Sequence, residues 1–418
     1  MILNMFDKII FFLKNQKKTF RIIILRDFSL LASGRRSQVR SEVGGYESLF
    51  LKRLGASPLE IGLVNSFLSL TSILFSVPAG WLTDRIKNMK KLYIASLGAG
   101  LLNYLAMAMA TNWLVFSIVS VWRTMADRLN MPAKTIIDVD ALSNKDRVMG
   151  LSIHRTITAV GGIIGPLLIA YIITSFGGLD YADSFRPVFL FQFVVSIVIF
   201  VIIWKGLDEI IVKRSEEQTG FLKSFSSIFQ GSTALKILFI KEILQSFFGL
   251  MSRPFLEIYQ VDVKLATAFI LGYMGAGEMI VDVFLSLPIS GLILKFGRRK
   301  IAYIGHLVGL LARSILFLTP ASHPEVLILY SILGSIEGCM YLGWDAFALE
   351  VVPQEIRGKY LGVREMFVGI MGIFAPLVGG IIWEISPDYL WWINALQWTF
   401  VAFPILILLM EKYDRHLR

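Results

Sequence analysis

The sequence predicts an all-α membrane protein whose twelve transmembrane helices form two pseudo-symmetric six-helix bundles. Hydrophobic residues make up 55% of the 418 residues and charged residues only 17%, which is too apolar for an ordinary water-soluble protein. The second half of the chain also repeats the first half at an offset of 210 residues. Two-fold repeats of membrane helices build proteins in which each half supplies one wall of a central cavity.

The repeat is visible as identical or similar residues at equivalent positions. The offset relates Arg147 to Arg357, Leu151 to Leu361, Pro166-Leu167 to Pro376-Leu377, Gly62 to Gly272, Glu47 to Glu257 and Asp127 to Glu337. Rocking of two such halves against each other would expose a shared cavity to alternate sides of a membrane.

Apolar windows of about 20 residues, the length that crosses a hydrocarbon core, recur between short polar loops. The expected spans lie near 22–51, 60–82, 92–111, 113–133, 150–174, 186–204, 235–258, 266–294, 301–319, 325–348, 360–384 and 390–410. This division predicts an interfacial segment at 1–21, an N-terminal bundle at 22–205, a linker at 206–233, a C-terminal bundle at 234–411 and a tail at 412–418.

Lysine and arginine are concentrated before the first span and after the second, sixth and eighth. Because basic loops are retained in the cytoplasm, this pattern places both termini there. The net charge of +10 lies in short loops next to apolar spans, where anionic lipid headgroups attract it. We therefore expect the lipid bilayer, and not nucleic acid, as the partner of these charges. The lone Cys339 excludes a disulfide within the chain.

A basic loop occurs in both halves. The first copy contains Gly80, Asp84, Arg85, Lys90 and Lys91, and the second contains Gly291, Gly297, Arg298 and Arg299. Together they resemble the Gly-x-Leu-x-Asp-Arg-x-Gly-Arg-Lys loop of the major facilitator superfamily, although the first copy lacks the second glycine and the second lacks the aspartate.

The resemblance covers essentially the whole chain and implies a twelve-helix transporter fold with a cytoplasmic latch at Asp84. Arg147 and Arg357 are expected at the same gate, and a small residue at Gly80 and Gly291 would permit close helix approach. His154-Arg155 and Arg364-Glu365 overlap in the repeat and indicate gate or packing salt bridges.

The first span is unusual because it carries charges where apolar residues are needed. The charged residues are Arg35, Arg36, Arg40, Glu42 and Glu47. One interpretation is that this segment does not cross, which leaves eleven spans. Wound as a helix, however, the charges share one face of about 160° and small residues lie opposite. Neither face suits lipid, so we expect a helix enclosed by protein with its charges toward a wet cavity.

Arg253 and Glu257 lie in the seventh span, which is the repeat partner of the first. Arginines from the first helix of each half resemble the anion-clamping arrangement of organophosphate-type members of the family. Guanidinium groups bind phosphate or carboxylate with two parallel hydrogen bonds. The alternative is that these arginines pair with Glu42, Glu47 and Glu257 as internal salt bridges.

Further acids lie inside predicted spans. Asp127 follows Arg123 by four residues and has Glu337 as its repeat counterpart, so these acids either face the cavity or form structural ion pairs. Glu278 and Asp282 share one face of the eighth span. Two neighbouring carboxylates in a poorly solvated place do not readily both ionise, so we expect proton coupling there. A nearby cation such as Arg253 is the alternative.

These observations favour a secondary transporter of a small organic solute that uses a proton or another coupling ion. We expect a monomer in the plasma membrane without a cofactor. We also expect no metal site and no enzymatic activity, because the four histidines are scattered and the cysteine is alone. The alternatives are a proton-coupled multidrug or cation exporter and a non-transporting sensor with the same fold. The direction of transport stays open.

Overall fold

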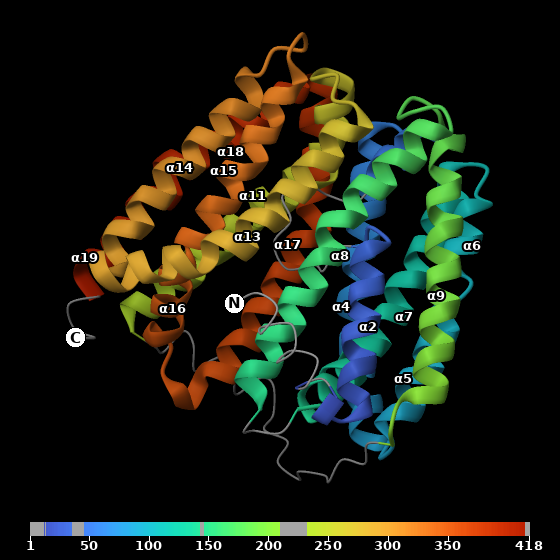
Figure 1. The fold of residues 1–418 in the computed structure, drawn as a ribbon. Helices are drawn as coiled ribbons and strands as arrows, with labels where there is room; N and C mark the ends of the chain where they lie inside the picture. The colour runs from blue at the N-terminus through green and yellow to red at the C-terminus, as the bar shows by residue number, and fades with distance from the viewer. Residues whose placement is uncertain (1–11, 13, 36–45, 143–145, 210–231, 414–418) are drawn as a thin grey trace, which may run out of the picture. The chain divides into compact units, whose positions relative to one another are not determined.

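The computed structural model describes residues 12, 14–35, 46–142, 146–209 and 232–413, and no β-strand occurs among them (Figure 1). The helices of the first half are α2 (Lys18–Ala32), α3 (Glu47–Arg53), α4 (Pro58–Arg85), α5 (Met89–Gly100), α6 (Asn103–Ala108), α7 (Trp113–Asp140), α8 (Arg147–Ser175), η1 (Ala182–Phe185) and α9 (Arg186–Gly206). The second half begins with α11 (Thr233–Ser252), η2 (Arg253–Phe255), α12 (Leu256–Ile258), the π-helix η3 (Tyr259–Val263), α13 (Ala268–Phe296) and α14 (Arg298–Leu318). It continues with η4 (Pro324–Val326), α15 (Leu327–Met340), α16 (Leu342–Val351), η5 (Gln354–Ile356), α17 (Arg357–Ile385), α18 (Pro387–Gln397), the π-helix η6 (Trp398–Ala402) and α19 (Phe403–Tyr413).

The prediction of an all-α membrane protein is confirmed. Eight helical stretches in the described residues are long and apolar enough to cross a membrane: Pro58–Thr83, Met149–Ser175, Ala182–Gly206, Ala268–Phe296, Arg298–Leu318, Pro324–Val351, Tyr360–Ile385 and Pro387–Lys412. Each corresponds to one of the expected spans. The other four expected spans are helical where they are described, as α2 with α3, α5 with α6, α7, and α11. The count of twelve crossings stays a prediction.

Local sequence explains where the helices begin. Ser57 and Glu60 form a capping box at the start of α4, in which the Ser57 N–H donates to the Glu60 carboxylate at 2.7 Å. Pro58 occupies the first helical position, where its missing N–H costs nothing. The side chains of Asn112 and Thr267 cap α7 and α13 by accepting a backbone N–H.

Prolines inside helices follow the repeat. Pro78 of α4 and Pro288 of α13 are equivalent positions, as are Pro166 of α8 and Pro376 of α17. Membrane helices tolerate such prolines because neighbouring groups satisfy the freed carbonyls. The repeat therefore extends to the places where the helix backbone loses a hydrogen bond.

The chain divides into two compact units. The first unit contains residues 1–37 and 74–215, and the second contains residues 38–73 and 216–418. The division falls inside α4, so α3 and the first part of α4 pack with the second half of the chain. The bundle boundaries expected at 22–205 and 234–411 stay predictions.

Both units contain a closely packed helix pair in equivalent positions, α2 with α8 and α11 with α17. Glycines make the close contact. A Cβ on Gly161 of α8 would lie 2.7 Å from the carbonyl oxygen of Phe28, and one on Gly379 of α17 would collide with the carbonyl oxygen of Met251. Small residues at such crossings let membrane helices pack backbone against backbone.

Candidate functional site

A network of charges surrounds the buried Arg26 inside the first unit. The Arg26 guanidinium of α2 contacts Asp138 of α7 at 2.9 Å, the adjacent Asp27 at 2.8 Å and the Tyr93 hydroxyl at 3.2 Å. Asp27 also lies 2.9 Å from His154 Nε2 on α8. Each charge has an opposite charge within hydrogen-bond reach, as buried ions require. The network joins α2 to helices α5, α7 and α8.

The second unit contains a similar network. Lys241 of α11 is buried, donates to Gln245 at 2.9 Å and lies 4.2 Å from the centre of the Trp344 ring. The adjacent Glu242 accepts a hydrogen bond from Tyr360 at 2.7 Å and contacts Arg364 of α17 at 3.0 Å. Both α2 and α11 thus carry a cation followed directly by an acid.

The two networks correspond through the repeat. His154 and Arg364, which contact the two acids, are 210 positions apart, whereas Asp27 and Glu242 are 215 apart. These acids are missed when a single offset of 210 is applied to the whole chain. The sequence does contain a signal for these acids, because a cation directly precedes each one within an apolar helix: Arg26-Asp27 and Lys241-Glu242.

Arg35, expected in the cavity, packs inside the first unit. Its guanidinium lies 3.7 Å from the centre of the Tyr104 ring and donates to the Gln192 carbonyl at 3.0 Å and to Ser196. Arg123 lies 5.9 Å from the same ring. Both arginines therefore contribute to packing around Tyr104. Arg36 and Arg40 lie outside the described residues.

Arg253 has a different environment. It begins η2 where α11 ends, its side chain is exposed, and it makes no hydrogen bond or ion pair with any residue that the structure describes. Glu257 lies one turn further and is buried, and its equivalent Glu47 is the first residue of α3. Asp127 of α7 is exposed. The alternative in which Arg253 pairs with Glu257 is not observed.

A second group of charges lies in the second unit, where α3 meets η3. Asp262 contacts Lys52 at 2.5 Å and Arg53 at 2.6 Å, and all three side chains are mostly buried. Nearby, Lys264 donates to the carbonyl of Phe317 at 2.7 Å. Burial lowers the pKa of Lys264 below its usual value, and the negative charge of Asp388 opposes this effect. Two cations on one carboxylate form a strong link between the two segments.

Glu278 and Asp282 of α13 contact a row of donors on α15. Ser331 donates to Glu278 at 3.0 Å and Ser335 donates to Asp282 at 2.9 Å. Cys339, one further turn along, lies 3.8 Å from the same Asp282 oxygen. A hydroxyl can donate to a carboxylate and accept from a carboxylic acid, so this row can serve both protonation states.

Glu337 pairs with Arg313 of α14 at 2.9 Å. The guanidinium of Arg313 in turn lies 3.9 Å from the centre of the Trp398 ring. A Cβ on Gly309 would collide with the Glu337 carboxylate, so this glycine makes room for the pair. Sequence alone does not identify this partner, because Arg313 lies on a neighbouring helix and not on the helix of Glu337. Glu337 therefore has a structural partner, and its role in a cavity stays a prediction.

The first basic loop connects α4 and α5. Lys90 donates to the carbonyl of Leu207 at 2.5 Å, and Asn88 caps α5 by accepting the N–H of Lys91. The Arg85 guanidinium lies 3.8 Å from the centre of the Trp81 ring. Asp84 is the penultimate residue of α4. The latch at Asp84 stays a prediction.

The second basic loop connects α13 and α14. Gly297 has φ +87°, a conformation that favours glycine, and so lets the chain turn between the helices. Arg298 contacts Glu350 at 2.6 Å, and Arg357 donates to the carbonyl of Leu349 at 2.9 Å. Arg299 lies in the first turn of α14, and Arg147 is the first residue of α8.

The close helix approach expected at Gly80 and Gly291 is not found. A Cβ on either residue would meet no atom of the described chain within 4 Å. These two glycines are 211 residues apart, one more than the repeat offset. Neither lies at a tight helix crossing like those of Gly161 and Gly379.

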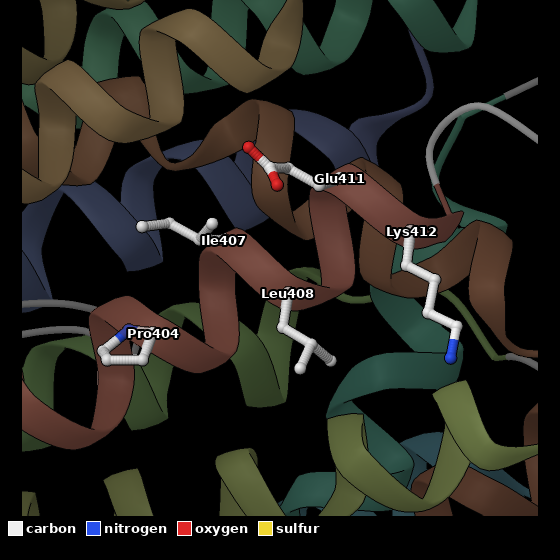
Figure 2. A pocket seen from close by; sticks show the side chains of 5 residues that line it. All are labelled: Pro404, Ile407, Leu408, Glu411 and Lys412. Atoms are coloured by element: carbon white, nitrogen blue, oxygen red, sulfur yellow. The ribbon is translucent and has the colours of Figure 1, made fainter.

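An open pocket lies on α19 and is lined by Pro404, Ile407, Leu408, Glu411 and Lys412 (Figure 2). All five residues belong to one helix near the end of the chain, so this depression does not bring together any of the charges described above. Among the described residues no group of three or more His, Cys, Asp or Glu side chains could hold a metal ion.

Comparisons with known proteins agree with this architecture. The nucleoside transporter NupG is similar in structure, with a TM-score of 0.70 and 17% identity over 94% of this chain and 98% of NupG. A POT family transporter in complex with 5-aminolevulinic acid has a TM-score of 0.66 and 11% identity over 95% of this chain and 96% of that one. At these identities the likeness establishes the fold alone.

Sequence comparisons establish the family. An uncharacterized MFS-type transporter of Methanocaldococcus jannaschii is 21% identical over 352 residues, which cover 81% of this chain and 83% of that protein. The model of the Major Facilitator Superfamily matches residues 43–277 and 243–416, which is most of the chain. The protein therefore belongs to the major facilitator superfamily.

Proposed function

We propose that the protein is a secondary transporter that moves a small organic anion across the plasma membrane by alternating access, with both termini in the cytoplasm. Family membership and the two-fold repeat support transport. The basic loops after the second, sixth and eighth spans support the orientation.

The environment of Arg253 is the observation that supports an anionic solute. Its neighbours Met251, Ser252 and Pro254 to Val261 are buried, whereas the Arg253 side chain is exposed. An arginine at the junction of α11 and η2, among buried apolar neighbours, is costly to expose to lipid, so we infer that its exposed side faces water or solute. Because no described residue pairs with it, its charge is available to a phosphate or carboxylate.

Replacing Arg253 by glutamine should reduce uptake of anionic solutes into proteoliposomes at least about tenfold, because one charge-assisted contact is lost. Lysine should restore part of the activity, since it keeps the charge but not the planar fork. The measurement compares initial rates for anionic, neutral and cationic solutes. Lys236→Gln removes one exposed charge from α11, the helix that ends just before Arg253, and should leave the rates unchanged. Equal rates for Arg253→Gln and its parent on every anion would exclude the proposed role.

A second candidate, proton-coupled export of cations or drugs, is favoured by the Glu278 and Asp282 pair. Their serine partners stabilise the neutral and the charged form alike, which suits carboxylates that carry a proton. This candidate predicts that cationic solutes are carried, that neutralising these acids stops their transport, and that Arg253→Gln is tolerated.

We expect Glu278→Gln with Asp282→Asn to abolish accumulation driven by a pH gradient and to spare exchange of solute across equal pH. A neutral pair cannot release the proton that couples the gradient to the cycle. The measurement is uptake with an imposed pH gradient beside counterflow without one, and Glu384→Gln, an exposed acid at the end of α17, is the control. Gradient-driven uptake that persists in the double variant would show that coupling lies elsewhere.

A further inference from the structure

The two charge networks differ at one repeat position. In the second unit the acid Glu242 contacts Arg364, whose guanidinium stays charged at every physiological pH. In the first unit the equivalent contact of Asp27 is His154, at 2.9 Å. Imidazole is the side chain that gains and loses a proton between about pH 5 and pH 8. The repeat therefore places an arginine beside the acid in one half and a histidine beside it in the other.

The charged and titratable groups around His154 come from three other helices. Arg26 and Asp27 lie on α2, Lys134 and Asp138 on α7, and the Tyr93 hydroxyl on α5. On α8 itself the adjacent Arg155 is exposed. No acidic or basic side chain of α9 contacts the imidazole in the described chain. Two cations and two acids balance each other, so the neutral imidazole leaves the cluster without net charge.

The geometry also assigns the proton positions. An ionised Asp27 only accepts hydrogen bonds, so His154 Nε2 must carry a hydrogen in the neutral ring and an arriving proton adds to Nδ1. The resulting imidazolium keeps its bond to Asp27 and competes with Lys134, whose Nζ lies 3.9 Å from the same carboxylate.

We propose that the Asp27 and His154 pair binds a proton and forms a second protonation site, in addition to Glu278 and Asp282. Its part in transport rests on the proposed function, but proton binding does not. The exposed His323 provides an internal comparison, because it contacts Glu325 at 3.0 Å on a surface segment.

Two measurements on the full chain test this proposal. In the first, the protein carries isotope-labelled histidine in lipid nanodiscs, and nuclear magnetic resonance follows its imidazole signals between about pH 5 and pH 8. His154→Arg and His154→Gln identify the signal. We expect that signal to change with pH, and Asp27→Asn to alter this change, because the Asp27 carboxylate contacts the imidazole directly. Two results would overturn the proposal that the pair binds a proton. One is a His154 signal that does not change over this range, and the other is a pH dependence of the signal that is the same in Asp27→Asn and in the parent.

The second measurement is the pH dependence of uptake in proteoliposomes. His154→Arg reproduces the fixed charge of the second unit, so we expect transport to persist and to lose at least half of its variation with pH. His154→Gln should flatten the same profile, while His323→Gln should preserve it. A parent-like profile in both His154 variants would overturn the role in transport. If no solute is transported at all, the proposed function fails while the resonance result still decides proton binding.

Discussion

Replacing Gly379 by alanine should destabilise the folded protein by about 1–3 kcal/mol, because the added methyl group meets atoms that cannot move aside. The nearest atom is the carbonyl oxygen of Met251 on α11, and a ring carbon of Phe255 lies 2.9 Å from the position of the new Cβ. A backbone oxygen inside a helix has no rotamer to change. The helices α11 and α17 must therefore separate or tilt.

The same helix provides a matched control. Gly362 also lies in α17, but a Cβ there would meet no described atom within 4 Å. Gly362→Ala should leave stability unchanged or raise it by up to about 1 kcal/mol through the higher helix propensity of alanine. The check is the midpoint of thermal unfolding in one detergent. Equal midpoints for the two variants would contradict the packing argument.

Composition and periodicity were sufficient to predict the helical membrane fold. The apolar windows that predicted spans also predicted the helices, since a chain in lipid must satisfy its backbone within each helix. The prolines of α4 and α13 and those of α8 and α17 lie at the predicted 210-residue spacing. The sequence did not predict that α3 and the first part of α4 pack with the second half, because repeats define homologous segments and not the contacts between them.

The candidate site was less predictable, because ion pairs depend on neighbouring helices. The sequence analysis noted Glu337 as an acid inside an apolar span. In the structure it is buried, and its partner Arg313 is 24 residues away on α14. Arg35 is likewise charged and inside the fold, but it packs on Tyr104. Charge in an apolar span indicates a partner, and only the packing identifies which one.

The register of the first helices of the two halves also hid the correspondence between Asp27 and Glu242. Asp27 and Glu242 are 215 residues apart, whereas Glu47 and Glu257 are 210 apart, so the first half holds five more residues within this stretch. A single offset therefore aligns α3 with α12 but misaligns α2 with α11. The additional residues fall in the segment that also carries the unusual charges of the first span.

Neutralising Asp262 should open the packing of α3 against η3. Lys52 and Asp262 are repeat counterparts, 210 residues apart, and they contact each other at 2.5 Å. Because the repeat counterparts carry opposite charges, Lys52 attracts Asp262. With Arg53 also bound, Asp262→Asn leaves two adjacent cations without their shared carboxylate. A partly buried link of this kind contributes about 1–2 kcal/mol, more than a fully exposed pair.

Access of a thiol reagent to Ser66→Cys in a Cys339→Ala background measures this opening, because Cys339 is the chain's only cysteine. Ser66 lies on α4, is 5% exposed, and donates to the carbonyl of Gly62 at the contact with α17. We expect about tenfold faster labelling in Asp262→Asn, since each 1.4 kcal/mol changes a population tenfold. High salt should speed labelling of the parent, because it screens the pair.

Two further variants separate a specific link from a general effect of charge. Arg53→Asp combined with Asp262→Arg exchanges the partners and should slow labelling again, because the pair is restored in reverse. Asp183→Asn removes an acid from an exposed pair with Arg186, at 2.7 Å, and should change nothing. If Asp262→Asn labels no faster than Asp183→Asn, the contact does not hold α3 against η3. If it labels faster and the exchange restores protection, this ion pair holds α3 against η3.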